Sequence, residues 1–162
     1  MKKRWLGIDP GLAIIGWAIL EDHELKEPSL IDYGTIETHK GIPTPARLLE
    51  IADDMTAIAQ EFRPDQVAIE MPYFSRQIKA AGGVMQALGV INLVIYRELN
   101  CLPIMLHQAS WKCHLGHGRA TKDEVAEILQ NFFNLPDLPI DDSVDAIGIG
   151  LAALQGVRNQ IS

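Results

Sequence analysis

Four acidic residues lie at the ends of apolar segments, where a carboxylate is poorly solvated. Asp9 and Glu70 each close a short apolar run, and Asp142 and Asp145 open an apolar C-terminal segment. Clustered carboxylates repel one another unless a divalent cation neutralises them. A carboxylate cage for Mg²⁺ with open coordination positions is the machinery of two-metal phosphodiester hydrolysis. We therefore take these four residues as candidate metal ligands and expect the fold to bring them together.

A third acid, Asp141, lies beside Asp142 and Asp145, so the sequence leaves open which two of the three form the pair. Residues 141–145 read Asp-Asp-Ser-Val-Asp, and positions three or four apart share one face of a helix. Either Asp142 with Asp145 or Asp141 with Asp145 can therefore present two carboxylates. Acidic residues also stabilise a helix N-terminus in any protein. One acid would serve for that, so three acids in five residues favour a site.

The segment around Asp9, Gly-Ile-Asp-Pro-Gly at 7–11, ends an expected strand with a sharp turn. Such a turn leaves room for a phosphate or a metal ion beside the carboxylate, although Asp-Pro-Gly also suits an ordinary hairpin. Actin-like and sugar-kinase-type ATPases begin with a similar loop. That class needs a second glycine-rich loop and an adenosine motif, and neither is visible in the 162 residues. We therefore keep an ATPase as the less favoured alternative.

The charge is unevenly distributed. The chain has a net charge of −7, yet residues 71–122 carry six basic residues and one acid. A local basic face can bind a polyanion on an acidic protein because charge interactions are screened over roughly 8–10 Å. Aromatic residues beside basic ones also suit base stacking. The candidate DNA-binding residues are Tyr73, Phe74, Arg76, Lys79, Lys112, Arg119 and Lys122.

The hydrophobic pattern predicts a single α/β domain over residues 1–162. Three strands are expected at 3–9, 14–20 and 30–37, and a helix follows from Thr44, taken as its N-cap, to 62. The later strands are expected at 66–70 and 103–107, and the later helices at 75–100, 109–115, 121–133 and 141–156. This order predicts a mixed sheet, first antiparallel and then parallel, with helices on both faces. The two cysteines form no disulfide framework, and we expect neither a signal peptide nor a membrane span, which favours a cytoplasmic protein.

Taken in order, five motifs resemble the RuvC family of Holliday-junction resolvases, which have an RNase H-like fold. They are Gly-Ile-Asp-Pro-Gly at 7–11, Ala-Ile-Glu at 68–70, Gln-Ala-x-Gly-Val at 86–90, Gly-x-Gly-Arg-Ala-x-Lys at 116–122 and Asp-x-x-Asp-Ala at 142–146. The resemblance implies that Asp9, Glu70, Asp142 and Asp145 are the catalytic ligands of two Mg²⁺ ions, with Mn²⁺ as a plausible substitute. It also implies that Tyr73 stacks on bases of a four-way DNA junction. The helix from 75 would line a homodimer interface, and a branch-migration helicase complex is a possible partner.

The sequence departs from the family pattern at three points. Trp111 stands where the family usually has lysine, Leu88 stands where it has arginine, and the chain is acidic where most members are basic. These departures raise a second alternative, a non-catalytic junction-binding protein of the same fold. The four intact carboxylates favour the nuclease, because a pure DNA binder has no use for clustered acids.

Overall fold

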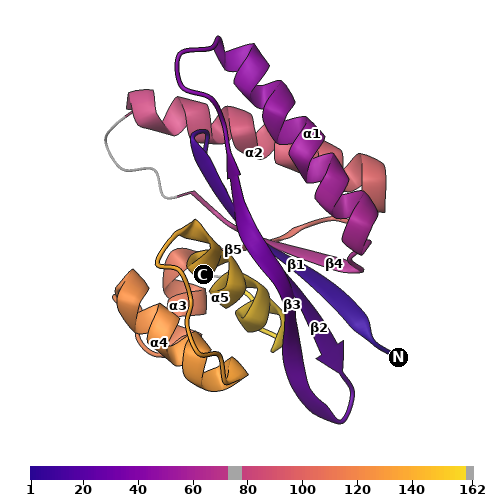
Figure 1. Cartoon of the computed structure of the whole chain (residues 1–162), viewed down its shortest axis with the longest axis vertical. Helices are drawn as coiled ribbons and strands as arrows, with labels where there is room; N and C mark the ends of the chain where they lie inside the picture. The colour runs from indigo at the N-terminus through magenta and orange to yellow at the C-terminus, as the bar shows by residue number, and fades with distance from the viewer. Residues whose placement is uncertain (73–77, 160–162) are drawn as a thin grey trace.

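The computed structural model describes residues 1–72 and 78–159, with residues 78–80 described by their backbone alone. Its centre is a five-stranded sheet with the strand order β3-β2-β1-β4-β5 (Figure 1). β1 (Lys3–Asp9), β2 (Ile14–His23) and β3 (Lys26–Glu37) form an antiparallel meander. β4 (Gln66–Glu70) pairs in parallel with β1, and β5 (Ile104–Leu106) pairs in parallel with β4.

Helices cover both faces of this sheet. α1 (Thr44–Phe62) and α2 (Ile78–Leu99) pack on one face, whereas α3 (Gln108–Leu115), α4 (Lys122–Phe133) and α5 (Asp142–Leu154) lie on the other (Figure 1). The predicted mixed sheet between two helical layers is confirmed. None of the helices in the described parts of the chain is long and apolar enough to cross a membrane.

Side chains alternate between the two faces of the sheet along each strand, and this alternation decides which of them face α5. On β1, Leu6 and Ile8 are buried against α1 and α2, while Trp5 belongs to the core around α5. On β4, Ile69 belongs to the core beneath α1 and α2, and Ala68 belongs to the core around α5. Because alternate residues of a strand point to opposite faces, the strand ends at positions 9 and 70 both present their side chains on the α5 face.

The hairpin between β2 and β3 is longer than the sequence predicted. Residues 21–29, which lie between the predicted strands 14–20 and 30–37, continue both strands and turn at residues 24–25. Glu21 is tolerated inside β2 because Lys2 and Arg4 lie 3.0 and 3.5 Å from its carboxylate oxygens. Pro28 is tolerated because β3 is an edge strand, where one side of the backbone needs no partner.

The other element boundaries are close to those predicted. β1 and β4 have the predicted bounds, and the helix ends differ by one or two residues within the described ranges. The N-terminus of α1 is a correction: Pro43 is the N-cap and Thr44 is the first helical residue, with no side-chain cap. α4 begins with a capping box, since Thr121 and Glu124 satisfy each other's backbone N–H groups.

Candidate active site and metal centre

Asp9 and Glu70 lie next to each other at the ends of adjacent parallel strands. Ile8 of β1 is paired with Ile69 of β4 in the parallel ladder, and the acidic residues follow directly. Both side chains point to the face that α5 covers. The carboxyl ends of parallel strands are where α/β folds place their sites, so two of the four expected residues meet at such an edge.

The N-terminus of α5 packs directly on the strand beside Asp9. Gly16 is the residue of β2 that pairs with Asp9, and a Cβ atom on Gly16 would lie 1.9 Å from the carbonyl oxygen of Asp142. One turn further along α5, a Cβ atom on Gly7 would lie 2.1 Å from the carbonyl oxygen of Ala146. These glycines let helix backbone touch strand backbone, and this contact brings the acids of α5 to the strand ends.

The four carboxylates perturb one another strongly. Burial, together with the charges of Glu70, Asp145 and Asp142, raises the pKa of Asp9 to about 8. Burial also raises the pKa of Glu70 and that of Asp145 above their ordinary values. The charge of Asp145 contributes to the rise at Glu70. The structure therefore brings the four predicted residues into one electrostatically coupled cluster.

Among the described residues, Lys122 is the cation that pairs with this cluster. Its Nζ lies 2.7 Å from Asp142 Oδ1 and 3.7 Å from Asp145 Oδ2. Burial opposes the charge on Lys122, but the hydrogen bond to Asp142 and the nearby charges of Asp145 and Asp9 outweigh it and raise the pKa of Lys122. Lys122 is the first residue of α4, and the capping box at Thr121 fixes where that helix starts.

Asp141 and Asp142, which the sequence left as alternatives, have different surroundings. Asp141 is the N-cap of α5, and its Oδ1 accepts the backbone N–H of Ser143 at 2.8 Å and also the Ser143 hydroxyl. Asp142 instead faces Lys122 and contributes to the electrostatic field at Asp9. The geometry therefore favours Asp142 as the member of the cluster and gives Asp141 the capping role.

The donor set suits a hard divalent cation. Four carboxylates offer oxygen ligands of the kind that Mg²⁺ and Mn²⁺ prefer. Asp145 Oδ1 is buried and accepts no hydrogen bond from the described residues, so it has an unused lone pair inside the cluster. Within the described ranges, no three acidic, histidine or cysteine side chains surround one point closely enough to ligate an ion as they stand. Ion binding would therefore require some of these side chains to move, and Lys122 would have to release Asp142.

Trp111 is a partner of the site that the sequence did not reveal. Its indole Nε1 donates a hydrogen bond of 2.7 Å to Glu70 Oε2, and its side chain is fully buried. Lys112, next along α3, places its Nζ 5.5 Å from the centre of the Trp111 ring. The charge of Lys112 also lowers the pKa of Glu70 and of Asp145 against the effect of burial. α3 thus contributes one neutral donor and one ammonium beside the carboxylates.

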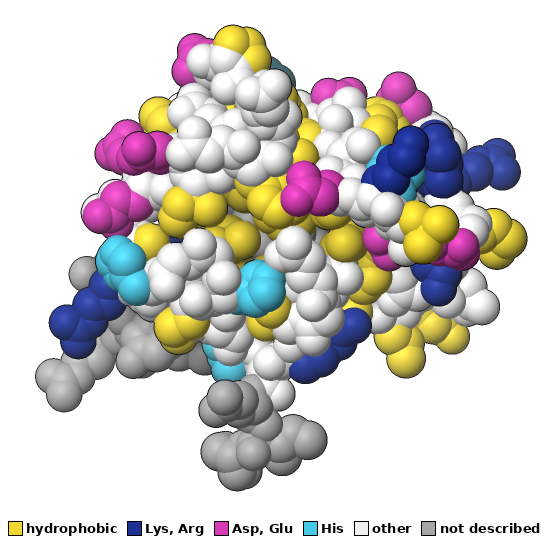
Figure 2. Space-filling view, turned by 90° about the horizontal axis from the view of Figure 1, so that it is seen from below, with side chains coloured by type: hydrophobic (Ala, Val, Ile, Leu, Met, Phe, Trp, Pro, Cys, Tyr) yellow, Lys and Arg dark blue, Asp and Glu magenta, His cyan; other side chains and the backbone are white. Residues whose placement is uncertain are grey.

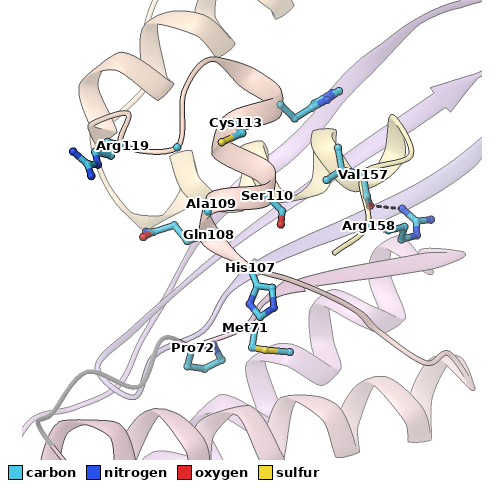
Figure 3. Close-up of a pocket in the computed structure, with 12 residues that line it drawn as sticks. Met71, Pro72, His107, Gln108, Ala109, Ser110, Cys113, Arg119, Val157 and Arg158 are labelled. Atoms are coloured by element: carbon cyan, nitrogen blue, oxygen red, sulfur yellow. Dashed lines mark hydrogen bonds between the residues drawn. The ribbon is translucent and has the colours of Figure 1, made fainter. Parts of the chain in front are cut away.

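A groove lies next to the strand end that carries Glu70, although none of the four carboxylates lines it. Its volume is about 1390 Å³, and its lining includes Met71 and Pro72, directly after Glu70, together with α3 residues. Its lining includes two arginines and two histidines, which are Arg119, Arg158, His107 and His114; Figure 3 labels the first three. In Figure 2, dark blue lysine and arginine side chains and cyan histidine side chains lie on the lower part of the face.

The predicted DNA-binding residues are only partly described. Tyr73, Phe74 and Arg76 lie outside the described residues, and so does the side chain of Lys79. Among the rest, Lys112 and Lys122 border the carboxylates, and Arg119 lines the groove. The sequence had not singled out Arg158, which reaches the groove from the segment after α5.

Comparison with known proteins identifies the family. The profile of the family described as crossover junction endodeoxyribonuclease RuvC matches residues 5–153. The chain belongs to the RuvC family. A RuvC protein of Synechocystis sp., described as a crossover junction endodeoxyribonuclease, is 67% identical over 159 residues, which are 98% of this chain and 95% of that protein.

Solved structures agree with this assignment. Thermus thermophilus RuvC in complex with a Holliday junction substrate superposes with a TM-score of 0.86 at 26% identity, covering 96% of this chain and 98% of that one. The yeast mitochondrial Holliday junction resolvase Ydc2 has a TM-score of 0.70 at 13% identity, covering 94% and 79%, and supports the fold alone. The RNase H-like fold and the predicted family are therefore confirmed, and the ATPase alternative is set aside.

Proposed function

We propose that this chain is a structure-selective DNA endonuclease that resolves four-way junctions, and that residues 1–162 form its single nuclease domain. The observation that carries the proposal is the coupled cluster of Asp9, Glu70, Asp142 and Asp145 in a member of a nuclease family. A relative at 26% identity has been solved in complex with a Holliday junction substrate. Paired cuts across such a junction would separate two recombining duplexes in DNA recombination and repair.

The four carboxylates would hold two Mg²⁺ ions, and Mn²⁺ would substitute. Bound divalent ions supply an activated water nucleophile and stabilise the leaving oxygen in phosphodiester hydrolysis. We infer products with a 5′-phosphate and a 3′-hydroxyl, which a ligase can reseal. The buried Asp145 Oδ1 supports this assignment, because it accepts no hydrogen bond from the described residues and lies in a cluster whose charges raise the pKa of Asp9.

The lysines beside the cluster would act on the substrate phosphate. Lys122 contacts Asp142 and Asp145, and Lys112 lies close enough to influence Glu70 and Asp145. With divalent ions bound to the carboxylates, these ammonium groups would be free to bind and orient a phosphodiester and to offset its developing negative charge. Arg119 and the groove beside the site would guide the DNA backbone toward the carboxylates.

The partner in a junction-cutting dimer would be a second copy of this chain, docked along α2. Met85, Leu93 and Tyr96 are exposed apolar residues on that helix. Gly82 and Gly89 have nothing within 4 Å of where a Cβ would be. These positions follow a spacing of three, four and seven, so they share one helix face, and the glycines permit close approach of a second helix. A two-fold dimer would match two cuts on a junction with two-fold symmetry.

Two further assignments follow from the proposed activity. Junctions would be delivered by a branch-migration helicase complex, because a resolvase acts on a mobile branch point. The cytoplasm would be the site of action, where the free thiols of Cys101 and Cys113 remain reduced. Co-purification with junction-bound helicase and fractionation of cell extracts would test these assignments.

The deciding experiment uses an end-labelled synthetic four-way junction with Mg²⁺, a linear duplex of the same sequence, and the Asp142→Asn variant. We expect paired, ligatable nicks in the junction alone, and we expect their loss in the variant. Binding to the junction without nicks in either Mg²⁺ or Mn²⁺ would favour the non-catalytic junction-binding protein. Equal cutting of the linear duplex would contradict structure selectivity.

A further inference from the structure

Trp111 joins the two halves of the carboxylate cluster. Its indole N–H donates to Glu70, which belongs to the sheet, at 2.7 Å. The opposite edge of the same ring packs on α5: a Cβ atom on Gly148 would lie 2.7 Å from Trp111 Cζ3. Gly148 is three residues beyond Asp145, so it lies about one helical turn from it. The ring therefore contacts one carboxylate and the helix that carries two others.

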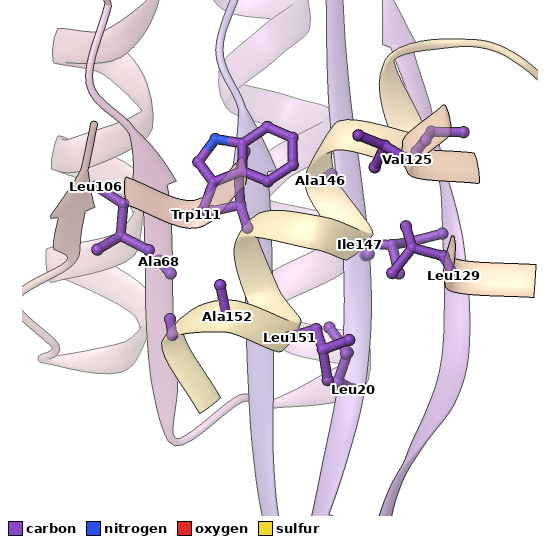
Figure 4. Close-up of a cluster of buried hydrophobic side chains, with 14 of the residues drawn as sticks. Leu20, Ala68, Leu106, Trp111, Val125, Leu129, Ala146, Ile147, Leu151 and Ala152 are labelled. Atoms are coloured by element: carbon purple, nitrogen blue, oxygen red, sulfur yellow. The ribbon is translucent and has the colours of Figure 1, made fainter. Parts of the chain in front are cut away.

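The ring has little freedom to move. Trp111 is fully buried, and it packs in the core that includes Ala68, Leu106 and Ala146. Figure 4 shows the ring between the strand residues and α5. A rigid donor fixes the orientation of the carboxylate that accepts from it, because rotating Glu70 away would leave the buried indole N–H unsatisfied.

We propose that Trp111 is a positioning residue for the metal centre, holding Glu70 by Oε2 so that Oε1 is presented to a divalent ion. The inference rests on the proposed function, since it concerns the ligands of the same site. Residues that hydrogen-bond a metal ligand raise affinity by fixing the ligand's orientation, and their loss typically costs about 10- to 100-fold in affinity or activity. The neutral indole performs this task without adding a positive charge that would repel the ion.

The test compares Trp111→Phe with a matched control, Trp5→Phe. Trp5 is also buried in the core around α5, but its indole N–H finds no acceptor among the described residues. Both substitutions remove the same atoms from the same core, and only one removes the donor to Glu70. The readouts are Mn²⁺ binding without DNA, followed by electron paramagnetic resonance of the free ion, and thermal unfolding of each protein.

We expect Trp111→Phe to weaken Mn²⁺ binding by about 10- to 100-fold, and Trp5→Phe to change it by less than about twofold. A second version replaces Trp111 with 3-benzothienylalanine, which keeps the ring shape and exchanges the N–H for sulfur. This protein should unfold at nearly the same temperature as the unmodified chain and still bind Mn²⁺ poorly. The Mg²⁺ concentration for half-maximal cleavage should rise in parallel.

Unchanged Mn²⁺ binding by the benzothienylalanine protein would overturn the inference. An equal loss in Trp5→Phe would also overturn it, because the effect would then be one of core packing. If the unmodified chain itself neither binds Mn²⁺ nor cuts junctions, the proposed function fails instead. The two failures are therefore distinguishable.

Discussion

Replacing Asp9 with asparagine should abolish cleavage and at the same time stabilise the metal-free protein. Burial and three neighbouring carboxylates raise the pKa of Asp9 from 3.8 to about 8. Between these values the native state binds more protons than the unfolded state. The free energy of unfolding therefore falls as the pH rises from about 4 to about 8, and flattens above that. Asparagine has nearly the same shape and does not titrate, so it removes this loss.

The size of the effect follows from the same shift. For each pH unit between the unfolded and native pKa values, Asp9 lowers the free energy of unfolding by about 1.4 kcal/mol. At pH 7 the upper limit of this loss is therefore roughly 4 kcal/mol. The proton is shared among coupled carboxylates, so we expect the variant to gain roughly 1–3 kcal/mol at pH 7. At pH 5 the gain in stability should be smaller, because pH 5 lies only slightly above the unfolded pKa of 3.8.

Urea unfolding in EDTA at pH 5, 7 and 8 measures this difference. The control is Asp54→Asn, which changes an exposed carboxylate of α1 and should leave stability and its pH dependence unaltered. Added Mg²⁺ should stabilise the unmodified protein and not Asp9→Asn, since an ion that binds the native state stabilises it. A variant that is less stable than the unmodified protein at pH 8, or that still cuts junctions, would refute the reasoning.

Four other predictions address the same architecture. Lys122→Met should lower metal-free stability by about 1–2 kcal/mol in urea, because it leaves two carboxylates without their ammonium partner; unchanged stability would contradict this. Gly16→Ala should lower the free energy of unfolding in urea by more than about 3 kcal/mol, because its Cβ meets backbone of α5; an unchanged stability would contradict this. Leu93→Asp should convert a dimer to a monomer in sedimentation, and an unchanged mass would count against the α2 interface. Mg²⁺ binding at pH 7 should release about one proton, mainly from Asp9; calorimetry in two buffers of different ionisation enthalpy would give equal heats if it does not.

The strand ends were predictable because they depend on local pattern. An acid that follows a run of apolar residues and precedes a proline or glycine has to sit at the mouth of a buried strand, and this identified Asp9 and Glu70. The capping box of α4 was predictable for the same reason, since both partners lie within four residues. The long β2–β3 hairpin was missed because the ion pairs that support Glu21 come from residues 2 and 4, far away in the sequence.

The contacts that complete the site depend on tertiary packing. Nothing local to Trp111 indicates that its N–H reaches a residue 41 positions away. The choice between Asp141 and Asp142 likewise depends on which one caps the helix and which one meets Lys122, a residue of a different helix. The sequence pattern therefore predicts which residues can act as ligands or catalytic groups, and the packing of α3, α4 and α5 decides what each of them contacts.

The close seating of α5 on the strands has a consequence for how the protein is made. Asp9 and Glu70 leave the ribosome well before residues 142–145. α5 packs against β1, β2 and β4, and its backbone touches that of β1 at Gly7 and that of β2 at Gly16. A nascent chain therefore carries half of the carboxylates on an uncovered sheet and has no complete centre. Because domains generally fold as units during synthesis, nuclease activity should begin only after the last helix has docked, which keeps unfinished chains from cutting DNA.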